Sequence, residues 1–402
     1  MHIWETLMPS YLSPGVYIEE VETGLKPIEG VATGTAGFVG VTDKYGDNDL
    51  YRNRAIFISS WGDFVDKFGR YSETAPYMAP AVQSFFANGG ERCYVLSVQS
   101  EDDIIHTGLP ALSELNEVNV IAAPGMVSKR VQQTLITQCE SLPNRTCILD
   151  SAQGAGIEEV QQQREHLVSD KGYGALYFPW VKMSVEKEIS LGNNHLFRLG
   201  SGLIVSRRGF KKKIVSEDIF VPPSGAIAGL YARVDRERGV HKAPANEVLR
   251  SAMELEYSVS TEEQEILNPK GINCIRSFPG RGIRVWGART LSSDREWKYV
   301  NVRRLMNYLE ASISEGTQWA VFEPNNEQLW VKVKQSVENF LLQAWRSGAL
   351  MGSRPDEAFF VRCDRTTMTQ NDIENAKVVV QIGVAPLKPA EFMIFTITQH
   401  TG

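Results

Sequence analysis

A serine, an aspartate and two histidines are the residues of this chain best suited to catalysis. Ser224 follows two prolines and opens a run of small residues, and Asp150 ends an apolar segment. A serine nucleophile needs a histidine base that a carboxylate orients, so Asp150 would be the acid and His166 or His195 the base. Neither histidine lies in a recognisable motif, and Ser224 also suits the start of a closely packed helix. We therefore favour a structural role for Ser224 and predict no catalytic residue.

Glycine and aspartate clusters near the N-terminus imitate phosphate and calcium loops. Residues 34–40, GTAGFVG, lack the Gly-Lys-Ser/Thr ending of a phosphate loop, so we expect a closely packed buried strand there. Asp43, Asp47 and Asp49 imitate part of a calcium loop, but its twelfth position would be Arg54, which cannot bind a cation. The 6 histidines and 5 cysteines show no HExxH or paired-cysteine spacing. The sequence thus predicts no metal and no cofactor.

Length and composition narrow the class of protein. The 402 residues suffice for two or three domains, and 43% hydrophobic with 22% charged residues is usual for a soluble globular protein. A net charge of −6 argues against a general nucleic-acid binder. No apolar run approaches the roughly 18 residues of a membrane span, and the N-terminus lacks a secretory signal pattern. The scattered cysteines favour reduced thiols in a protein made in the cytoplasm.

The middle of the chain alternates apolar strands with helices. We predict strands at 93–98, 118–124, 145–150 and 175–181, and helices at 60–68, 80–88, 129–141 and 157–169. This alternation favours a largely parallel sheet that helices cover on both faces. Residues 91–267 should therefore form a middle α/β domain, preceded by a segment of the core at 25–90. A small-molecule-binding α/β protein is one function that the pattern leaves open.

Residues 183–220 interrupt this alternation. Alternating apolar and polar residues with glycine breaks predict a β-ribbon. A basic cluster follows, formed by Arg207, Arg208, Lys211, Lys212 and Lys213. Such a cluster could bind phosphate-rich ligands, or it could be a solvated loop paired with Glu217 and Asp218. We favour an exposed decoration.

The last third predicts an α+β domain, and both chain ends carry a strand. Helices are expected at 297–313 and 324–347, and strands at 317–322, 359–363 and 377–384. Terminal strands follow from the patterns at 16–21 and 391–398. A terminal strand must join a sheet of its own subunit or of a neighbour, because its backbone groups need partners. The pattern alone leaves both arrangements open.

Three segments, in their usual order, resemble the contractile tail sheath family of phages, contractile bacteriocins and injection systems. They are residues 11–21 (YLSPGVYIEEV), residues 221–246 (VPPSGAIAGLYARVDRERGVHKAPAN) and the segment that begins at Asn268 (NPKGINCIRSFPGRGIRVWGART). The resemblance extends from about Ser10 to the C-terminus. It implies a structural subunit with a subtilisin-like middle domain, a C-terminal α+β sheath core at 268–388, and arms at 1–24 and 389–402. Residues 25–90 would be the N-terminal part of a tube-proximal core.

The same resemblance implies how the subunit works. Family members stack in hexameric rings around an inner tube and contract without nucleotide, and their arms exchange strands between subunits. Here the exchanged residues would be Val16, Tyr17, Ile18, Glu19, Glu20, Val21, Phe392, Met393, Ile394, Phe395, Thr396 and Ile397. The implied partners are further copies of the chain, the inner tube protein, and baseplate and terminal cap proteins, without nucleic acid or membrane insertion. Assembly in the bacterial cytoplasm would precede incorporation into a phage tail or an extracellular contractile particle.

A basic segment supplies candidate contacts to the tube. From Arg281 to Arg304 seven basic residues stand against two acidic ones. Charged contacts suit an interface that must form and later break, because they add specificity more than affinity. We expect tube contacts at Arg295, Lys298, Arg303 and Arg304, with a solvated helix face as the alternative.

Overall fold

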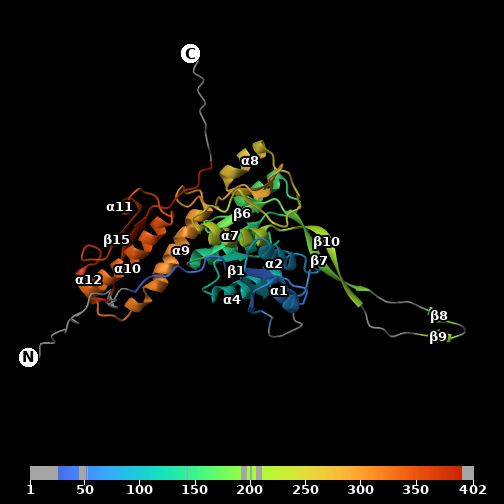
Figure 1. The fold of residues 1–402 in the computed structure, drawn as a ribbon, viewed down its shortest axis with the longest axis horizontal. Coiled ribbons are helices and arrows are strands. Elements are labelled where there is room, and N and C mark those ends of the chain that lie inside the picture. The colour runs from blue at the N-terminus through green and yellow to red at the C-terminus, as the bar shows by residue number, and fades with distance from the viewer. Residues whose placement is uncertain are drawn as a thin grey trace, which may run out of the picture.

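A nine-stranded sheet occupies the middle of the molecule (Figure 1). The computed structural model describes residues 26–44, 51, 53–142, 144–191, 197–199, 202–204 and 211–391. The strand order is β11-β14-β13-β6-β5-β4-β1-β3-β2. The bounds are β1 Ala36–Gly40, β2 Ala55–Ile58, β3 Cys93–Ser97, β4 Val120–Ala122, β5 Thr146–Asp150, β6 Gly174–Phe178, β11 Glu247–Val248, β13 Ile272–Phe278 and β14 Gly282–Val285. The strands from β13 to β3 are parallel, and antiparallel strands lie at both edges. The predicted, mostly parallel α/β sheet is confirmed.

Helices cover both faces of this sheet, and each face has its own hydrophobic core. One core includes α1 Trp61–Phe68, α2 Met78–Ala87 and α7 Ser224–Arg238. The other includes α4 Leu109–Ser113, α5 Lys129–Ser141 and α6 Ile157–Glu165. Because both faces are covered, successive residues of β1, β5 and β6 are all buried. Shorter elements complete the region: α3 Glu101–Asp103, the π-turn η1 Ile104–Gly108, α8 Thr261–Leu267 and η2 Asn268–Lys270.

The small residues at the start of α7 let it lie against the backbone of α2. A β-carbon on Gly225 would come within 2.2 Å of the Ala81 carbonyl oxygen. One on Gly229 would come within 2.2 Å of the Phe85 carbonyl oxygen. No larger residue fits at either position without moving a helix. Gly225 and Gly229 of the 221–246 segment therefore serve close helix packing, whereas Gly239 ends α7 at a φ of 87°.

The predicted ribbon is present and projects from the body of the protein (Figure 1). It consists of β7 Val181–Leu191 and β10 Lys211–Val221, paired antiparallel, with β12 Glu254–Leu255 beside β7 and the short pair β8 Phe197–Leu199 and β9 Gly202–Ile204 farther along. At the base of the ribbon Met183 and Val185 are buried in the core. The base is thus part of the domain rather than decoration, and only the outer part of 183–220 can be an exposed insertion.

A second domain follows the sheet and has its own core. It contains α9 Val300–Gly316, η3 Gln318–Ala320, α10 Glu327–Arg346, α11 Pro355–Ala358, β15 Phe359–Arg362, α12 Gln370–Glu374 and β16 Gln381–Val384. The strand expected at 317–322 is wrong, because Gln318–Ala320 form a 3-10 turn and Phe322 points fully into solvent. The strand expected at 377–384 is confined to its last four residues.

Two expected domain limits differ from the structure. Strands β1 and β2 belong to the central sheet, so the expected segment 25–90 contributes strands to the middle α/β domain rather than preceding it. Strands β13 and β14 also join that sheet, because β13 pairs in parallel with β6. The second domain therefore begins near α9 rather than at residue 268. Among the described residues, no helix is long and apolar enough to cross a membrane.

Candidate functional site

The serine and aspartate singled out in the sequence do meet, but inside the protein. The Ser224 hydroxyl donates to Asp150 Oδ2 at 2.7 Å, and the Ser224 backbone N–H donates to Oδ1 at 2.8 Å. The Gly125 N–H adds a third bond to Oδ2 at 3.0 Å. Ser224 is 0% exposed and Asp150 is 2% exposed. The carboxylate thus joins the end of β5 to the first turn of α7.

This geometry does not suit nucleophilic catalysis. The Ser224 proton is committed to a carboxylate, and no path from solvent reaches a hydroxyl with zero exposure. His166 ends α6, and His195 lies outside the described residues. Burial raises the pKa of Asp150 to about 6 despite the three hydrogen bonds that it accepts. Asp150 and Ser224 therefore form a structural contact between β5 and α7, in which the carboxyl group has a raised pKa.

Two of the four arginine and lysine residues expected to contact a tube are buried within the subunit. Arg304 is 4% exposed and donates twice to Asp235, at 2.8 and 2.6 Å. It also donates to the Thr33 carbonyl oxygen at 3.0 Å, and its guanidinium stacks 4.6 Å from the centre of the Tyr231 ring. Arg304 therefore ties α9 to α7, and its charge is already neutralised at close range.

Arg303 is equally enclosed. It is 2% exposed, and its guanidinium lies 4.5 Å from the Tyr173 ring centre and 4.2 Å from that of Trp297. Its Nε donates to Asn307 at 2.8 Å. The prediction of tube contacts is therefore wrong for Arg303 and Arg304, because neither side chain reaches the surface of the subunit. The sequence of two adjacent arginines beside the apolar face of a helix does not indicate whether their side chains are buried or exposed.

The other two candidate residues are accessible. Arg295 is exposed on the loop that precedes α9. Lys298 is half-buried, and its ammonium group lies 5.4 Å from the ring centre of Tyr299. Both could meet an acidic partner, so they keep the role that the sequence suggested as a proposal.

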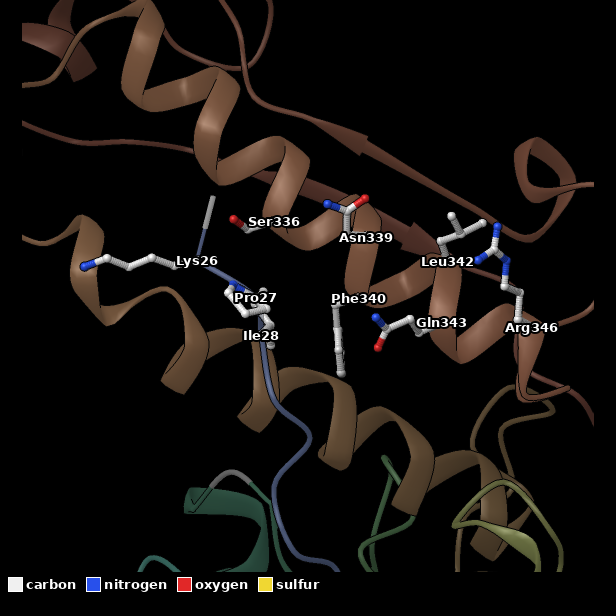
Figure 2. A pocket seen from close by; sticks show the side chains of 9 residues that line it. All are labelled: Lys26, Pro27, Ile28, Ser336, Asn339, Phe340, Leu342, Gln343 and Arg346. Carbon is white, nitrogen blue, oxygen red and sulfur yellow. The ribbon is translucent and has the colours of Figure 1, made fainter. Parts of the chain in front are cut away.

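The predicted arm strands, residues 16–21 and 392–397, lie outside the described residues, but the structure describes the segments next to them. On the N-terminal side, residues 26–28 run across α9 and α10, where Ile28 is buried and the Val31 N–H donates to Ser312 Oγ at 3.1 Å. Figure 2 shows this segment against one side of α10. The cavity between the segment and α10 has a volume of ≈ 240 Å³. It is lined by Lys26, Pro27, Ile28, Ser336, Asn339, Phe340, Leu342, Gln343 and Arg346. The first described residues are thus docked on the second domain.

The second domain contains a sheet of two strands. β15 and β16 pair antiparallel from Phe359↔Val384 to Arg362↔Gln381. Phe360 on β15 is 45% exposed, and Val378 and Val379, just before β16, are 37% and 39% exposed. A pair of strands is marginally stable by itself, and among the described residues no third strand pairs with β15 or β16, so another strand could add at an edge. The sequence predicted these strands but did not reveal that they stand apart from the central sheet.

The C-terminal side is held by a buried ion pair that the sequence did not indicate. Arg289 donates through Nε to Glu391 Oε1 at 2.9 Å, and its terminal NH2 group donates to Glu391 Oε2. The two side chains are 6% and 16% exposed. Tyr299 adds a hydroxyl contact to Glu391 at 3.3 Å. Arg289 lies in the segment that begins at Asn268, but its partner is 102 residues away along the chain.

Comparison with known proteins agrees with this architecture. Residues 103–291 match the phage tail sheath protein central domain, and residues 292–400 match the phage tail sheath C-terminal domain. The boundary between the matches falls just before α9. The chain belongs to the phage tail sheath family.

Sequence relatives include phage tail sheath proteins. The chain is 28% identical over 178 residues to the tail sheath protein of Vibrio phage KVP40, which is 43% of this chain and 26% of that protein. It is 22% identical over 339 residues to the tail sheath protein of Escherichia phage P2, or 77% of each chain. The match thus spans about a quarter of the length of the KVP40 relative and most of the P2 relative.

Solved sheath structures match over nearly the whole chain. The anti-feeding prophage (AFP) helical sheath in the contracted state shares 31% identity at a TM-score of 0.76, covering 97% of this chain and 100% of that one. The PVC sheath complex of an extracellular contractile injection system, also contracted, shares 31% identity at a TM-score of 0.75, covering 98% and 99%. Within the family, the chain is thus similar in length and fold to injection-system sheath subunits.

Proposed function

We propose that this protein is a sheath subunit that polymerises helically around an inner tube and contracts to drive the tube through a target envelope. The observation that carries the proposal is the match of 97–98% of the chain, at 31% identity, to sheath subunits of contracted particles. A role in a polymer also explains a domain whose two-stranded sheet carries partly exposed apolar residues.

The arms and the open sheet complement each other. An extended peptide can add to a free sheet edge, where main-chain hydrogen bonds provide affinity and the side chains provide specificity. We propose that residues 16–21 and 392–397 of neighbouring subunits add to the edges of β15 and β16 and cover Phe360. Strand addition keeps subunits linked while the bodies rotate, because the main-chain hydrogen bonds of the added strands need not break.

The free energy of contraction would be stored during assembly. We propose that the subunits pack in a strained extended helix and relax to a wider and shorter one, so no nucleotide or metal takes part. The role is structural rather than catalytic, which agrees with the closed environment of Ser224. A subtilisin-like arrangement of the central domain is part of the proposal, supported by Asp150 at a strand end and Ser224 at the start of a buried helix.

Contacts with the tube would involve the accessible basic residues before α9. Arg295 and Lys298 stay in the proposal, and Arg303 and Arg304 leave it because they are buried. Baseplate and cap proteins would contact the two ends of the polymer. Synthesis and assembly in the bacterial cytoplasm agree with five buried free cysteines, Cys93, Cys139, Cys147, Cys274 and Cys363.

Electron microscopy of the purified protein tests the polymer directly. Long hollow cylinders are expected, and discrete globules at every concentration would contradict the proposal. Co-assembly with the cognate tube protein tests the tube contact through the variant Arg295→Glu/Lys298→Glu. Charge reversal at an interface costs affinity and should prevent extended particles, while tube-free cylinders persist. Extended particles formed by that variant as by the parent would remove both residues from the interface.

A further inference from the structure

We propose that Arg289 and Glu391 form a positioning clamp that sets the direction in which the C-terminal arm leaves the subunit. The inference rests on the proposed exchange of arms. Glu391 is the last described residue and the first of the predicted strand 391–398, and it is held by Arg289 of the central domain. The arm therefore starts from the central domain, although β16, the strand before it, belongs to the second domain.

The residues before the clamp run from one domain to the other along a fixed path. The Ala385 N–H donates to the Ala358 carbonyl oxygen at 2.8 Å, which keeps the segment on the second domain. Asn301 then donates to the Leu387 carbonyl oxygen at 3.1 Å. Lys388 reaches Glu296 at 3.1 Å before the chain arrives at Arg289. We call residues 385–391 the strap.

The chemistry of the clamp suits orientation better than simple tethering. A guanidinium and a carboxylate joined by two parallel hydrogen bonds fix both position and angle. Arg289 is held in turn, because it donates to the Asn268 carbonyl oxygen at 2.9 Å. Its own backbone N–H donates to Asn273 Oδ1 at 2.7 Å, within the central sheet. Arg289 therefore fixes the orientation of Glu391 relative to β13.

A fixed exit direction lowers the entropic cost of adding a strand to a neighbour. A peptide that already points at its acceptor binds more tightly than one that must search, through a higher effective concentration. If the clamp supplies this pre-orientation, then uncoupling the arm from it should weaken assembly without changing the fold of the subunit.

The sharpest test inserts Gly-Ser-Gly-Ser between Glu391 and Phe392. The insertion leaves the ion pair in place and adds reach, but it removes the fixed direction. We expect the melting temperature of the monomer to stay at the parental value and the critical concentration for cylinder formation to rise by about tenfold or more. Sedimentation across a concentration series with electron microscopy of the pellets gives both numbers. Cylinders at the parental concentration would overturn the positioning role.

Two substitutions at the clamp and one at a residue that contacts the strap complete the test. Glu391→Asp keeps the charge but shifts the carboxylate, and Glu391→Gln removes the charge. Both should raise the critical concentration, and Glu391→Gln should also lower the melting temperature because Arg289 stays buried. Glu296→Gln is the control, since it breaks the exposed contact to Lys388 on the same strap and should change neither value. A parental critical concentration for Glu391→Asp would count against the clamp.

Deletion of residues 392–402 separates the clamp from the proposed arm. Loss of cylinders on deletion, with no effect of the insertion, would overturn the clamp and leave strand exchange intact. Cylinders that form normally after the deletion would instead overturn strand exchange by the C-terminal arm, and the clamp with it. Loss of cylinders on deletion, together with a raised critical concentration and an unchanged melting temperature for the insertion variant, is the expected result.

Discussion

The two domains of this subunit differ in how fully their strands are paired within the chain. The central sheet has nine strands, helices on both faces and two buried cores, so its strands find their partners within the chain. The second domain has one core beneath a two-stranded sheet, with Phe360, Val378 and Val379 partly in solvent. A polymer subunit that rearranges can combine one domain that is complete by itself with a second domain whose sheet is completed by neighbouring subunits. Mutations in the first domain should therefore act on stability, and mutations at the open sheet should act on assembly.

The largest effect on stability is expected where the two domains join. Arg304→Ala leaves Asp235 as a buried carboxylate without its cation, which should lower the free energy of unfolding by about 3–5 kcal/mol. Urea unfolding monitored by tryptophan fluorescence measures it. The matched control Arg295→Ala removes an exposed arginine nearby and should change stability by no more than about 0.5 kcal/mol. Equal effects of the two variants would mean that the buried pair does not join the domains.

The contribution of Asp150 to the free energy of unfolding should be larger in acid than at neutral pH. Burial raises the pKa of Asp150 to about 6, above the value near 3.9 expected in the unfolded chain. The favourable contribution is therefore complete below about pH 4 and is lost as the pH rises to about 6, by about 3 kcal/mol. Urea unfolding of the parent and of Asp150→Asn at pH 4, 5, 6 and 7 measures this contribution as the difference between their free energies of unfolding. The parent should lose stability relative to the variant across this window, and parallel profiles would contradict the assignment.

Close packing of α7 on α2 should be sensitive to a single methyl group. Gly229→Ala would place a β-carbon 2.2 Å from the Phe85 carbonyl oxygen, so the helices must separate at a cost of about 1–3 kcal/mol. Gly62→Ala in α1 is the matched control, because its nearest neighbour would be 3.9 Å away. That substitution should be neutral or stabilise by up to about 1 kcal/mol. Thermal unfolding of the two variants compares them directly, and a neutral Gly229→Ala would show that α7 has room to move.

The smallest effect on stability, with the largest on assembly, is expected at the open sheet. Phe360→Ser changes a residue that is 45% exposed, so monomer stability should shift by no more than about 0.5 kcal/mol while cylinders are lost. Val361→Ser, one position along β15, removes a side chain that is 5% exposed and should destabilise the monomer itself. Thermal unfolding together with sedimentation distinguishes the two. Normal cylinders from Phe360→Ser would show that this face is not an acceptor for arms.

Local sequence patterns predicted much of the central sheet. The apolar runs at β1, β5 and β6 are recognisable because strands buried on both faces cannot alternate with polar residues. The helix expected at 60–68 is α1, and Ser60 is its N-cap, where the serine hydroxyl accepts from the Asp63 N–H at 3.1 Å. The pattern failed at Gln318–Ala320, where an apolar run forms a 3-10 turn and leaves Phe322 in solvent. Short apolar runs do not distinguish strands from turns at a domain surface.

What the sequence determined by itself was the family and the order of its elements, since three motifs and the strand–helix alternation are properties of neighbouring residues. Only the tertiary structure decided which polar side chains meet. Asp150 and Ser224 are 74 residues apart, and Asp235 and Arg304 are 69 apart. Arg304 and Arg295 look alike as sequence, yet one is buried against a carboxylate and the other is in solvent. Burial depends on how elements distant in the sequence pack. That packing decides whether an arginine forms a buried ion pair between domains or lies at the surface.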